Sequence, residues 1–598
     1  MGKAKHNLND KAKFPDMVSW FSVPVLIDAA RRAILSALFG SYADRRLVHA
    51  ALNLMDDTAL SNHCDCREKV CGSSKDEVWI DYVADTGDGF ESTYTIAYLL
   101  GSGFLSLGNG IENLQLPRGN VLVMGGDEVY PTPTREEYQR RFDRPYKLAF
   151  PEGSGAKAPL LFMLPGNHDW YDGLTLFLAR YCSGKGASFG GWKLHQSRSY
   201  FATQILDNWW IFGVDTQLGE DIDIPQAEYF QRVVERMPEY SNIILCASVP
   251  TWLDAAWSKN EDDRDLRSKF ERGIDYVATK IIKEKNPTAR IPLVLSGDKH
   301  HYSRYFASKT ETHFITSGGG GAFLHPTHLL EDKIEHVSWI KQDETLVLGH
   351  RKENQVSDAP IEACYPSRGT SRILTFGNLL FPLKNPQFCL VLGVVYSFIG
   401  LLLILFRSQP ETHVLGVGNL WTPLAFVLLS CFFGIFYAYT DSRKKWIKGV
   451  GALLHGGAHY VALFILTCLV FSDAVEAQQL NSFSLIIPLL KMLVLGGVVA
   501  GVIWGIYLFC SLRFLKMHSN DGFSSMSIKD YKNFLRIKVT KDTLTVYPIG
   551  VDRPLSRDKW ENNESDHGAG IVPKEAIELR LIENPIEVML TRTHKEVG

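Results

Sequence analysis

The segment Leu160-Leu-Phe-Met-Leu-Pro-Gly-Asn-His-Asp169 joins a short apolar run to a turn that carries an amide, an imidazole and a carboxylate. Other apolar runs end in a similar way, at Asp85, Gly125-Gly-Asp127, Asp215, Ser248 and Gly297-Asp-Lys-His300. Short, uninterrupted apolar runs bounded by turn residues are typical of strands that are buried on both faces. These runs therefore predict the strands of a buried sheet.

Helical patterns separate some of these strands, for example at residues 226–237 and 265–285. Alternation of strands and helices indicates an α/β domain. Such sheets place their binding sites beyond the carboxyl ends of the strands. We therefore expect one edge of the sheet to gather Asp85, Asp127, Asn167, His168, Asp298 and His300.

These side chains are typical ligands of hard and borderline metal ions. Two such ions close together can bind a phosphate and lower the pKa of a bridging water. The order of the motifs resembles the calcineurin-like metallophosphoesterase superfamily, most closely its purple-acid-phosphatase-like branch. The motifs are Asp85-Thr-Gly87, Gly126-Asp-Glu-Val-Tyr130, Gly166-Asn-His-Asp169 and a last motif that ends at His300, and the resemblance covers residues 76–330.

The resemblance implies a layered β-sandwich flanked by helices and a role for each matching residue. Asp85, Tyr130 and His300 would bind the first metal ion, with Tyr130 in the place of the phenolate ligand of the purple acid branch. Asp127 would bridge both ions and Asn167 would bind the second. His168 would contact the phosphate or the leaving oxygen as a hydrogen-bond donor or general acid.

Two positions depart from the family pattern. Asp298 stands where the motif Gly-His-x-His has its first histidine, and Ser248 stands where a lone histidine is expected. Both departures affect the second ion, whose remaining ligands would be the oxygen donors of Asp127, Asn167 and Asp298. Oxygen ligands suit Mn²⁺ or Mg²⁺ better than Zn²⁺. We therefore expect two divalent ions among Mn, Fe, Mg and Zn, the second held more weakly.

Further polar residues follow the last motif. Arg304 could bind the phosphate of a substrate or pair with a carboxylate at the surface, and His325 or His328 could replace the missing imidazole. Asp88 and Asp169 are expected to orient ligands. Separately, His63-Cys-Asp-Cys66 with Cys71 could bind zinc or consist of reduced surface thiols.

Charge is absent from long stretches in the second half of the chain. Four runs hold no charge apart from Lys491 in the last, and they cover residues 386–406, 420–440, 449–471 and 486–510. Each is long enough to cross a hydrocarbon core of about 30 Å. The runs predict four transmembrane helices within residues 375–515. The net charge of −3 gives no sign of nucleic-acid binding.

Basic residues determine the expected orientation of these helices. The loop Asp441–Lys448 between the second and third runs is strongly basic, and Arg513 and Lys516 follow the fourth. The positive-inside rule then places both termini and the catalytic domain in the cytoplasm. No signal peptide opens the sequence, so we expect a multi-pass protein of the cell membrane.

Two features of these runs have more than one interpretation. His455 and His459 share one face of the third helix and could bind a metal, haem or protons, or pack against polar partners. Gly497, Gly501 and Gly505 form a smooth face that could serve a homodimer or the helix bundle itself.

The remaining segments complete the predicted domain organisation. Residues 1–75 are expected to be helical, and an amphipathic helix over residues 20–39 would dock on the soluble domain or lie on the membrane surface. The metallophosphoesterase domain would span residues 76–350. Residues 516–598 contain a hairpin around Lys541-Asp542 and predict a small β-rich cytoplasmic module.

Together these patterns predict a membrane-anchored phosphoesterase that hydrolyses a phosphate monoester or diester with a metal-activated water. The substrate could be linked to the membrane. The alternative is a receptor or transport component that binds metal and a phosphorylated ligand without turning it over.

Overall fold

The chain folds into two compact units in the computed structural model. Unit 1 comprises Met1–Val18, Arg32–Arg368 and Lys529–Gly598, and unit 2 comprises Ser19–Arg31 and Gly369–Ile528. Unit 2 is thus inserted in the sequence of unit 1. The structure describes residues 6–28, 31, 55–70, 76–108, 113–153, 158–182, 186–216, 221–255, 269–349, 363–407, 421–476, 482–565 and 568–589.

The first sheet of unit 1 has nine strands in the order β21-β18-β17-β1-β4-β5-β7-β6, with β22 paired to β18. The neighbours β1, β4, β5 and β7 are parallel, so their carboxyl ends share one edge. The bounds are β1 Glu77–Val83, β4 Val121–Met124, β5 Leu160–Met163, β6 Ser188–Phe189, β7 Trp192–Leu194, β17 Lys532–Thr540, β18 Thr543–Val551, β21 Arg580–Leu581 and β22 Ile586–Met589.

The second sheet also has nine strands, in the order β14-β15-β12-β13-β11-β10-β9-β8, with β16 paired to β12. Its centre is parallel, because β9, β10, β11 and β13 run in one direction. The bounds are β8 Phe201–Leu206, β9 Trp209–Val214, β10 Asn242–Ala247, β11 Arg290–Ser296, β12 Tyr302–Ala307, β13 Thr312–Ser317, β14 Lys333–Trp339, β15 Gln342–Leu348 and β16 Cys364–Tyr365.

Three buried clusters hold these layers together. One cluster joins inner-face residues of both sheets, such as Ile80 and Ile537 from the first and Ile211 and Leu295 from the second. This shared core places the two sheets face to face. Burial of these aliphatic side chains is the main favourable term for such a fold.

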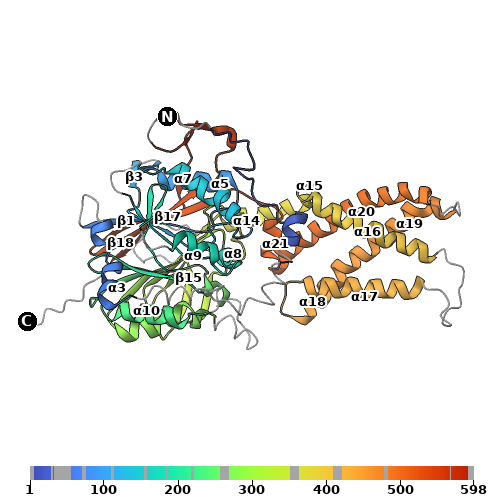
Figure 1. Cartoon of the computed structure of the whole chain (residues 1–598). Helices are drawn as coiled ribbons and strands as arrows, with labels where there is room; N and C mark the ends of the chain where they lie inside the picture. Colours follow the sequence, from blue (N-terminus) through green and yellow to red (C-terminus); the bar gives the residue numbers. More distant parts are fainter. Residues whose placement is uncertain are drawn as a thin grey trace, which may run out of the picture. The chain divides into compact units, whose positions relative to one another are not determined.

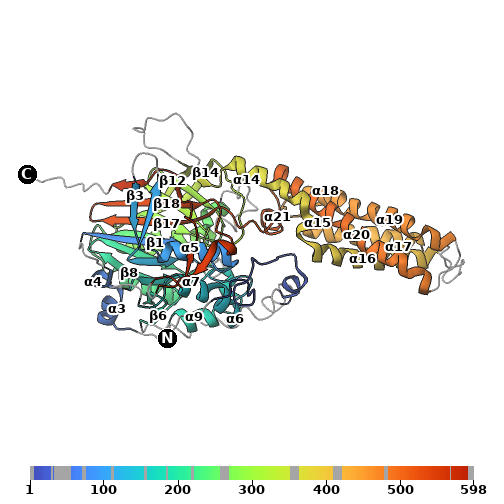
Figure 2. The ribbon, with the colours of Figure 1, turned by 90° about the horizontal axis from the view of Figure 1, so that it is seen from above.

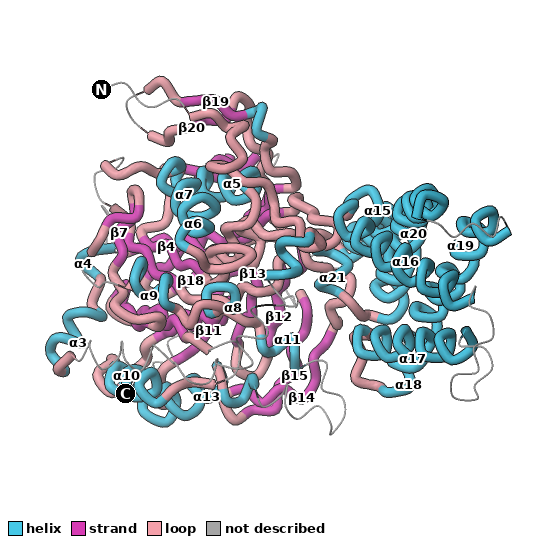
Figure 3. Tube along the Cα trace, turned by 45° about the vertical axis from the view of Figure 1, so that its right-hand side comes forward, coloured by secondary structure: helices cyan, strands magenta, loops and turns pink. Residues whose placement is uncertain are grey.

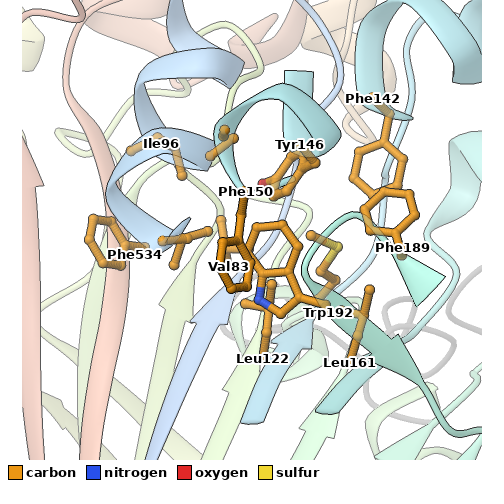
Figure 4. Close-up of a cluster of buried hydrophobic side chains, with 14 of the residues drawn as sticks. Val83, Ile96, Leu122, Phe142, Tyr146, Phe150, Leu161, Phe189, Trp192 and Phe534 are labelled. Carbon is orange, nitrogen blue, oxygen red and sulfur yellow. The ribbon is translucent and has the colours of Figure 1, made fainter. Parts of the chain in front are cut away.

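Helices cover the outer face of each sheet (Figures 1 and 3). On the first sheet, Figure 4 shows Val83, Leu122 and Leu161 of the strands beneath the aromatic rings of Tyr146 and Phe150. The helices there are α5 Phe90–Gly101, η1 Tyr138–Asp143, α7 Arg144–Ala149 and α9 Thr175–Tyr181. The second sheet is covered by α3 Asp57–Cys64, α10 Ile224–Val234, α13 Ile274–Tyr276 and η3 Val277–Lys283. The predicted mixed α/β class is confirmed.

The C-terminal segment corrects the predicted organisation. The predicted hairpin exists as β17 and β18, but it is not part of a separate module over residues 516–598. Instead, β17 pairs along its length with β1, and the two strands place Arg536 opposite Asp81. The guanidinium of Arg536 donates to both carboxylate oxygens of Asp81 at 2.7 and 3.1 Å and to the Leu116 carbonyl at 2.9 Å. Unit 1 is therefore completed by residues that follow unit 2.

Unit 2 consists mainly of apolar helices that run beside one another (Figure 2). They are α16 Pro386–Arg407, α17 Trp421–Tyr439, α18 Lys445–Gly451, η5 Ala452–Gly456, α19 Gly457–Glu476 and α20 Ser482–Cys510. Among the described residues, three helices are long and apolar enough to cross a membrane, at Pro386–Leu405, Lys445–Ser472 and Leu485–Leu515. The second predicted span, at residues 420–440, corresponds to α17, whose apolar part, Pro423–Tyr439, is shorter. Four spans therefore remain a prediction.

The glycine face of α20 is occupied within the chain. A Cβ atom at Gly497 would lie 2.5 Å from the Cys389 carbonyl oxygen, and one at Gly505 would lie 2.4 Å from that of Asn378. Small residues permit this close approach of helices. The face therefore serves packing inside unit 2, while a homodimer remains a prediction.

The N-terminal segment differs from one of its two expected placements, namely docking on the soluble domain. Its helical residues 23–28 belong to unit 2 rather than to the soluble domain. The ring of Phe21 packs edge-on against Phe381 and Phe388 at centroid distances of 5.3 and 5.2 Å. Aromatic contacts with residues at and just before the start of α16 thus hold this segment. Residues 29–30 and 32–39 of the predicted helix lie outside the described residues.

The pair formed by Arg536 and Asp81 gives a test of the fold. Arg536→Ala should lower the free energy of unfolding by about 3–5 kcal/mol, because it leaves a buried carboxylate without its partner. The matched control is Lys538→Ala on the same strand, whose ion pair with Glu77 is 34% and 38% exposed. The control should cost less than about 1 kcal/mol. Urea unfolding of the detergent-solubilised chain measures both, and equal losses would contradict a sheet completed by β17.

Candidate metal-binding site

Three aspartates that directly follow parallel strands share an unusual backbone conformation. Asp85 after β1, Asp127 after β4 and Asp298 after β11 have φ values of 58°, 55° and 63°. This left-handed region is costly for most side chains and tolerated best by glycine, asparagine and aspartate. Such strain persists where the surroundings enforce it, often at functional sites. The shared conformation therefore singles out these strand ends.

Hydrogen bonds and glycines bring the loops after β1 and β4 together. The Asp85 amide donates to the Gly126 carbonyl and the Thr86 amide to the Asp127 carbonyl, both at 2.9 Å. A Cβ atom at Gly166 would lie 2.0 Å from Asp127 Oδ1, and one at Gly318 would lie 2.3 Å from Asp85 Oδ2. Glycine is required at both positions because the backbone approaches the carboxylates so closely.

The Tyr130 hydroxyl joins the side chains of three other predicted ligands. Its oxygen lies 3.0 Å from Asp85 Oδ1, 3.2 Å from Asp127 Oδ2 and 3.1 Å from His300 Nε2. All four residues are buried, with 0% to 4% of their surfaces exposed. The structure thus brings Asp85, Asp127, Tyr130 and His300 together, as the sequence predicts. These four residues are called the Tyr130 group below.

The Tyr130 group has more hydrogen-bond acceptors than donors. His300 Nδ1 donates to the Phe323 carbonyl at 2.7 Å, so its Nε2 faces Tyr130 as an acceptor. The single hydroxyl proton of Tyr130 is therefore shared among three acceptor atoms. Asp85 Oδ2 is buried without a hydrogen-bond partner among the described residues. A buried, unsatisfied carboxylate oxygen is costly unless a cation or proton compensates it.

The pKa shifts in the Tyr130 group also indicate a place for a cation. Burial, with the charges of Asp127 and Asp298, raises the pKa of Asp85 well above its usual value. Burial, with Asp169 and Asp298, also raises the pKa of Asp127, while burial lowers the pKa of His300. The group favours neutral forms when no cation is present, and a bound cation would stabilise the carboxylates instead.

The distances from the Tyr130 oxygen to its three partners are those expected between neighbouring ligands of one metal ion. Two ligands at right angles on an ion with bonds of about 2.1 Å lie about 3.0 Å apart, which is close to the distances from Tyr130 to its partners. Within the described residues, no group of three or more His, Cys, Asp or Glu side chains has by itself the spacing of a metal site. Tyr130 is not one of these residue types, so the fit depends on its hydroxyl.

His168 lies beside this group as predicted. Its amide donates to Asp127 Oδ1 at 2.8 Å, and its ring centroid lies 4.4 Å from that of Tyr130. His168 Nδ1 donates to the Pro131 carbonyl at 2.8 Å, which leaves Nε2 as the nitrogen that can exchange a proton. Burial lowers the pKa of His168, although Asp169 and Asp298 oppose this effect.

Asp169 positions the loop that carries His168. Its carboxylate accepts from the Gly166 amide at 2.9 Å and from the Tyr138 hydroxyl at 2.5 Å. It also accepts from the Glu128 amide at 3.3 Å and thereby ties the loop after β5 to the loop after β4. The predicted orienting role of Asp169 agrees with these contacts.

Two predicted ligands of the second metal ion have other partners. The Asn167 side-chain amide donates to the Tyr171 hydroxyl at 3.1 Å. Asp298 pairs with Lys299 at 2.8 Å, although its amide still donates to Asp85 Oδ1 at 3.2 Å. Ser248 also lies nearby, because a Cβ atom at Gly126 would be 2.9 Å from its Cβ. The second set of ligands is therefore not assembled in the way that the first is.

The prediction that Arg304 binds substrate is corrected. Its guanidinium donates twice to Glu583, at 2.9 and 2.6 Å, and Tyr302 donates to the same carboxylate at 2.5 Å. Only 4% of the Arg304 surface is exposed. A bidentate buried pair of this kind fixes the guanidinium in place. Arg304 thus anchors the C-terminal segment to β12.

Sequence reasoning missed two residues of β17 near the site. Lys532 is buried, and its ammonium group donates to the Ala322 carbonyl. Burial lowers the pKa of Lys532 to about 8, while Asp88, Asp530 and Asp85 favour its charged form. The Asn533 side-chain oxygen accepts from the Ser317 hydroxyl at 2.9 Å, and the Asn533 backbone amide donates to the Gly319 carbonyl at 3.1 Å. These contacts support the glycine run beside Asp85.

Two histidines near the last motif have different places. The His325 ring stacks on the His300 ring with centroids 3.9 Å apart, so His325 lies at the edge of the site. His328 is buried after β13, next to Thr327, whose hydroxyl donates to the Pro366 carbonyl at 2.8 Å. His325 therefore lies next to a predicted metal ligand, and its role as an added imidazole remains a prediction.

The cysteine cluster near residue 64 is buried. The Cys64 thiol lies 3.6 Å from the Tyr229 hydroxyl, and burial raises the pKa of this thiol to about 12. Cys66 is also buried, contrary to the expectation of surface thiols. Thiols that stay protonated are poor zinc ligands. Cys71 lies outside the described residues.

Comparison with known proteins gives little further information. No protein-family model and no curated protein matches the chain. A solved structure of GAP50, described as the anchor in the inner membrane complex of Plasmodium, is 14% identical over 42% of this chain and 74% of its own, with a TM-score of 0.27. A structure of PhoD is 11% identical over 42% of this chain and 58% of its own, with a TM-score of 0.26. TM-scores this low carry no argument about function, which depends on the site residues themselves.

Metal binding at the Tyr130 group can be measured by thermal stability. Mn²⁺ added at about 100 times its dissociation constant to EDTA-treated protein should stabilise the fold by about 2.7 kcal/mol, because it binds only the folded state. Asp85→Asn should remove most of this stabilisation. Asp207→Asn, at a surface position, is the control and should retain it. A Mn²⁺ effect of equal size in the wild type and in Asp85→Asn would place the ion elsewhere.

Proposed function

We propose that this chain is a metal-dependent phosphoesterase of the calcineurin-like metallophosphoesterase superfamily. The observation that supports this proposal best is the meeting of Asp85, Asp127 and His300 around the Tyr130 hydroxyl, at distances of 3.0, 3.2 and 3.1 Å. These residues occur in the order of the family motifs. The group is also buried, rich in acceptors and placed at the carboxyl ends of parallel strands.

The site residues would divide the chemistry of phosphoester hydrolysis among them. Asp85, Asp127, Tyr130 and His300 would hold a divalent ion, which when bound polarises a phosphoryl oxygen and lowers the pKa of water. Asp127 also accepts the His168 amide and so fixes that residue at the rim. In its imidazolium form, His168 would donate the Nε2 proton to the leaving oxygen and keep the Nδ1 proton that the Pro131 carbonyl accepts.

The insertion of unit 2 supports an even number of membrane crossings. The chain leaves unit 1 after Arg368 and returns to it at Lys529. A folded domain with a polar surface remains on one side of a bilayer, so the helices between must cross an even number of times. Three long helices alone would give an odd number. The helix α17, with 19 residues and about 28 Å of length, would supply the fourth crossing.

This arrangement agrees with a cytoplasmic site on a multi-pass protein of the cell membrane. The basic loop between α17 and α18 would face the cytoplasm with both termini and unit 1. A phosphoester that lies at or near the membrane surface is then the most accessible substrate. Nothing in the charge distribution favours a nucleic acid.

Hydrolysis can be tested with a panel of phosphomonoesters and phosphodiesters in the presence of Mn²⁺, Mg²⁺, Fe²⁺ or Zn²⁺. Asp127→Asn should lower kcat/KM by at least about 100-fold, because it removes charge from the ligand set. His168→Gln should lower kcat by about 10²–10⁴-fold without loss of bound metal. Asp343→Asn, at an exposed position, should leave the rate unchanged.

The alternative of a non-hydrolytic phospho-ligand receptor predicts a different result from the same panel. The departures at Ser248 and Asp298 are the observations in its favour. Stabilisation of the protein by a phosphoester that is never turned over, in wild type and in Asp127→Asn alike, would exclude the hydrolase and support the receptor.

The number of crossings can be tested by cysteine labelling in a background that lacks the exposed Cys431 and Cys468. With four crossings, a membrane-impermeant maleimide should label Asp207→Cys in unit 1 and Ser442→Cys from the same side. It should label Ser408→Cys from the opposite side. Labelling of Ser408→Cys and Ser442→Cys from one side would show that α17 does not cross.

A further inference from the structure

The residue before His300 is a lysine that pairs with Asp298. Lys299 Nζ lies 2.8 Å from Asp298 Oδ2, and the two side chains are 35% and 23% exposed. Asp298 is therefore a carboxylate with an ammonium partner at the rim of the Tyr130 group.

Asp298 is tied to the proposed metal ligands as well as to Lys299. Its amide donates to Asp85 Oδ1 at 3.2 Å, and its φ of 63° fixes the direction of the chain at this point. The pair of Lys299 and Asp298 is therefore one hydrogen bond away from the Asp85 carboxylate.

Of the ligands expected for a second metal ion, Asp298 pairs with Lys299 and Ser248 stands in place of an imidazole beside Gly126. Asn167 donates from Nδ2 to Tyr171 at 3.1 Å, a bond that orients the amide without using the oxygen that would bind a metal ion. A second divalent ion that binds Asp298 through Oδ2 would have to displace Lys299. The Lys299 ammonium and a second metal ion would therefore compete for the Asp298 carboxylate.

We propose that the Lys299 ammonium takes the place of the second metal ion, so that the site holds one divalent ion and one lysine. This inference rests on the proposed function. In this arrangement the divalent ion would face the carboxylates of Asp85 and Asp127, and the Lys299 ammonium pairs with that of Asp298. Lysine is a compact point charge that binds phosphate oxygens, and the exposed part of Lys299 makes it accessible to a substrate from the solvent.

The role of Lys299 differs from that of an ordinary surface ion pair. An exposed pair between charged side chains contributes little, and its removal changes nothing nearby. Lys341 and Glu284 form such a pair at 3.2 Å, with side chains 65% and 42% exposed. Lys341→Met is therefore a matched control for a lysine that merely pairs with a carboxylate.

Metal stoichiometry and phosphate binding test this inference without an activity assay. Full-length detergent-solubilised protein is equilibrated with excess Mn²⁺, bound manganese is measured by elemental analysis, and inorganic phosphate is titrated by calorimetry. The wild type, Lys299→Arg and Lys341→Met should bind one Mn²⁺ per chain. Lys299→Met should bind phosphate at least about 10-fold more weakly at one Mn²⁺ per chain, and should take up a second Mn²⁺ at higher concentration because Asp298 is released.

Each other outcome is decisive. Two Mn²⁺ per wild-type chain would overturn the role of Lys299 and leave the phosphoesterase proposal standing. One Mn²⁺ per chain with unchanged phosphate affinity in Lys299→Met would also overturn the role of Lys299 and leave the phosphoesterase proposal standing. No bound Mn²⁺ in the wild type would overturn both proposals. The wild-type stoichiometry decides between one and two ions even if Lys299→Met fails to fold.

Discussion

The pairing of β17 with β1 is the constraint on which the rest of unit 1 depends. Residues 369–528 form another unit, so these two strands must meet across a long excursion of the chain. The buried pair of Arg536 and Asp81 fixes their register, because a shift would leave both charges without partners. The contacts of Lys532 and Asn533 with residues 317–322 then support the backbone beside Asp85.

The site gathers negative charge and acceptor atoms where a protein interior ordinarily avoids them. Asp85, Asp127 and Asp298 adopt left-handed backbone conformations, and glycines let neighbouring loops approach them. Arrangements that are costly for folding in this way are expected where a ligand compensates them. The proposed arrangement, with one divalent ion and Lys299 beside it, would account for the buried oxygens and for the departures at Ser248 and Asp298.

Local sequence predicted the strands well and their partners poorly. Apolar runs such as Leu160–Leu164 are long enough to identify a buried strand, and parallel strands bring their ends together, which is why the sequence predicts that Asp85, Asp127 and His300 meet. The partner of β17 and the pairing of Arg304 with Glu583 depend on contacts far apart in the chain, which no local pattern contains. One signal was present: Asp81 and Arg536 are opposite charges, each in the middle of an apolar run.

The central claim is that the Tyr130 group holds a metal ion. Anomalous diffraction from crystals of the full chain grown with Mn²⁺ tests it most directly. The account predicts one strong manganese peak within about 2.1–2.3 Å of oxygens of Asp85, Asp127 and Tyr130 and of His300 Nε2. A protein that crystallises in this fold without an anomalous peak at that position, despite saturating Mn²⁺, would contradict the account.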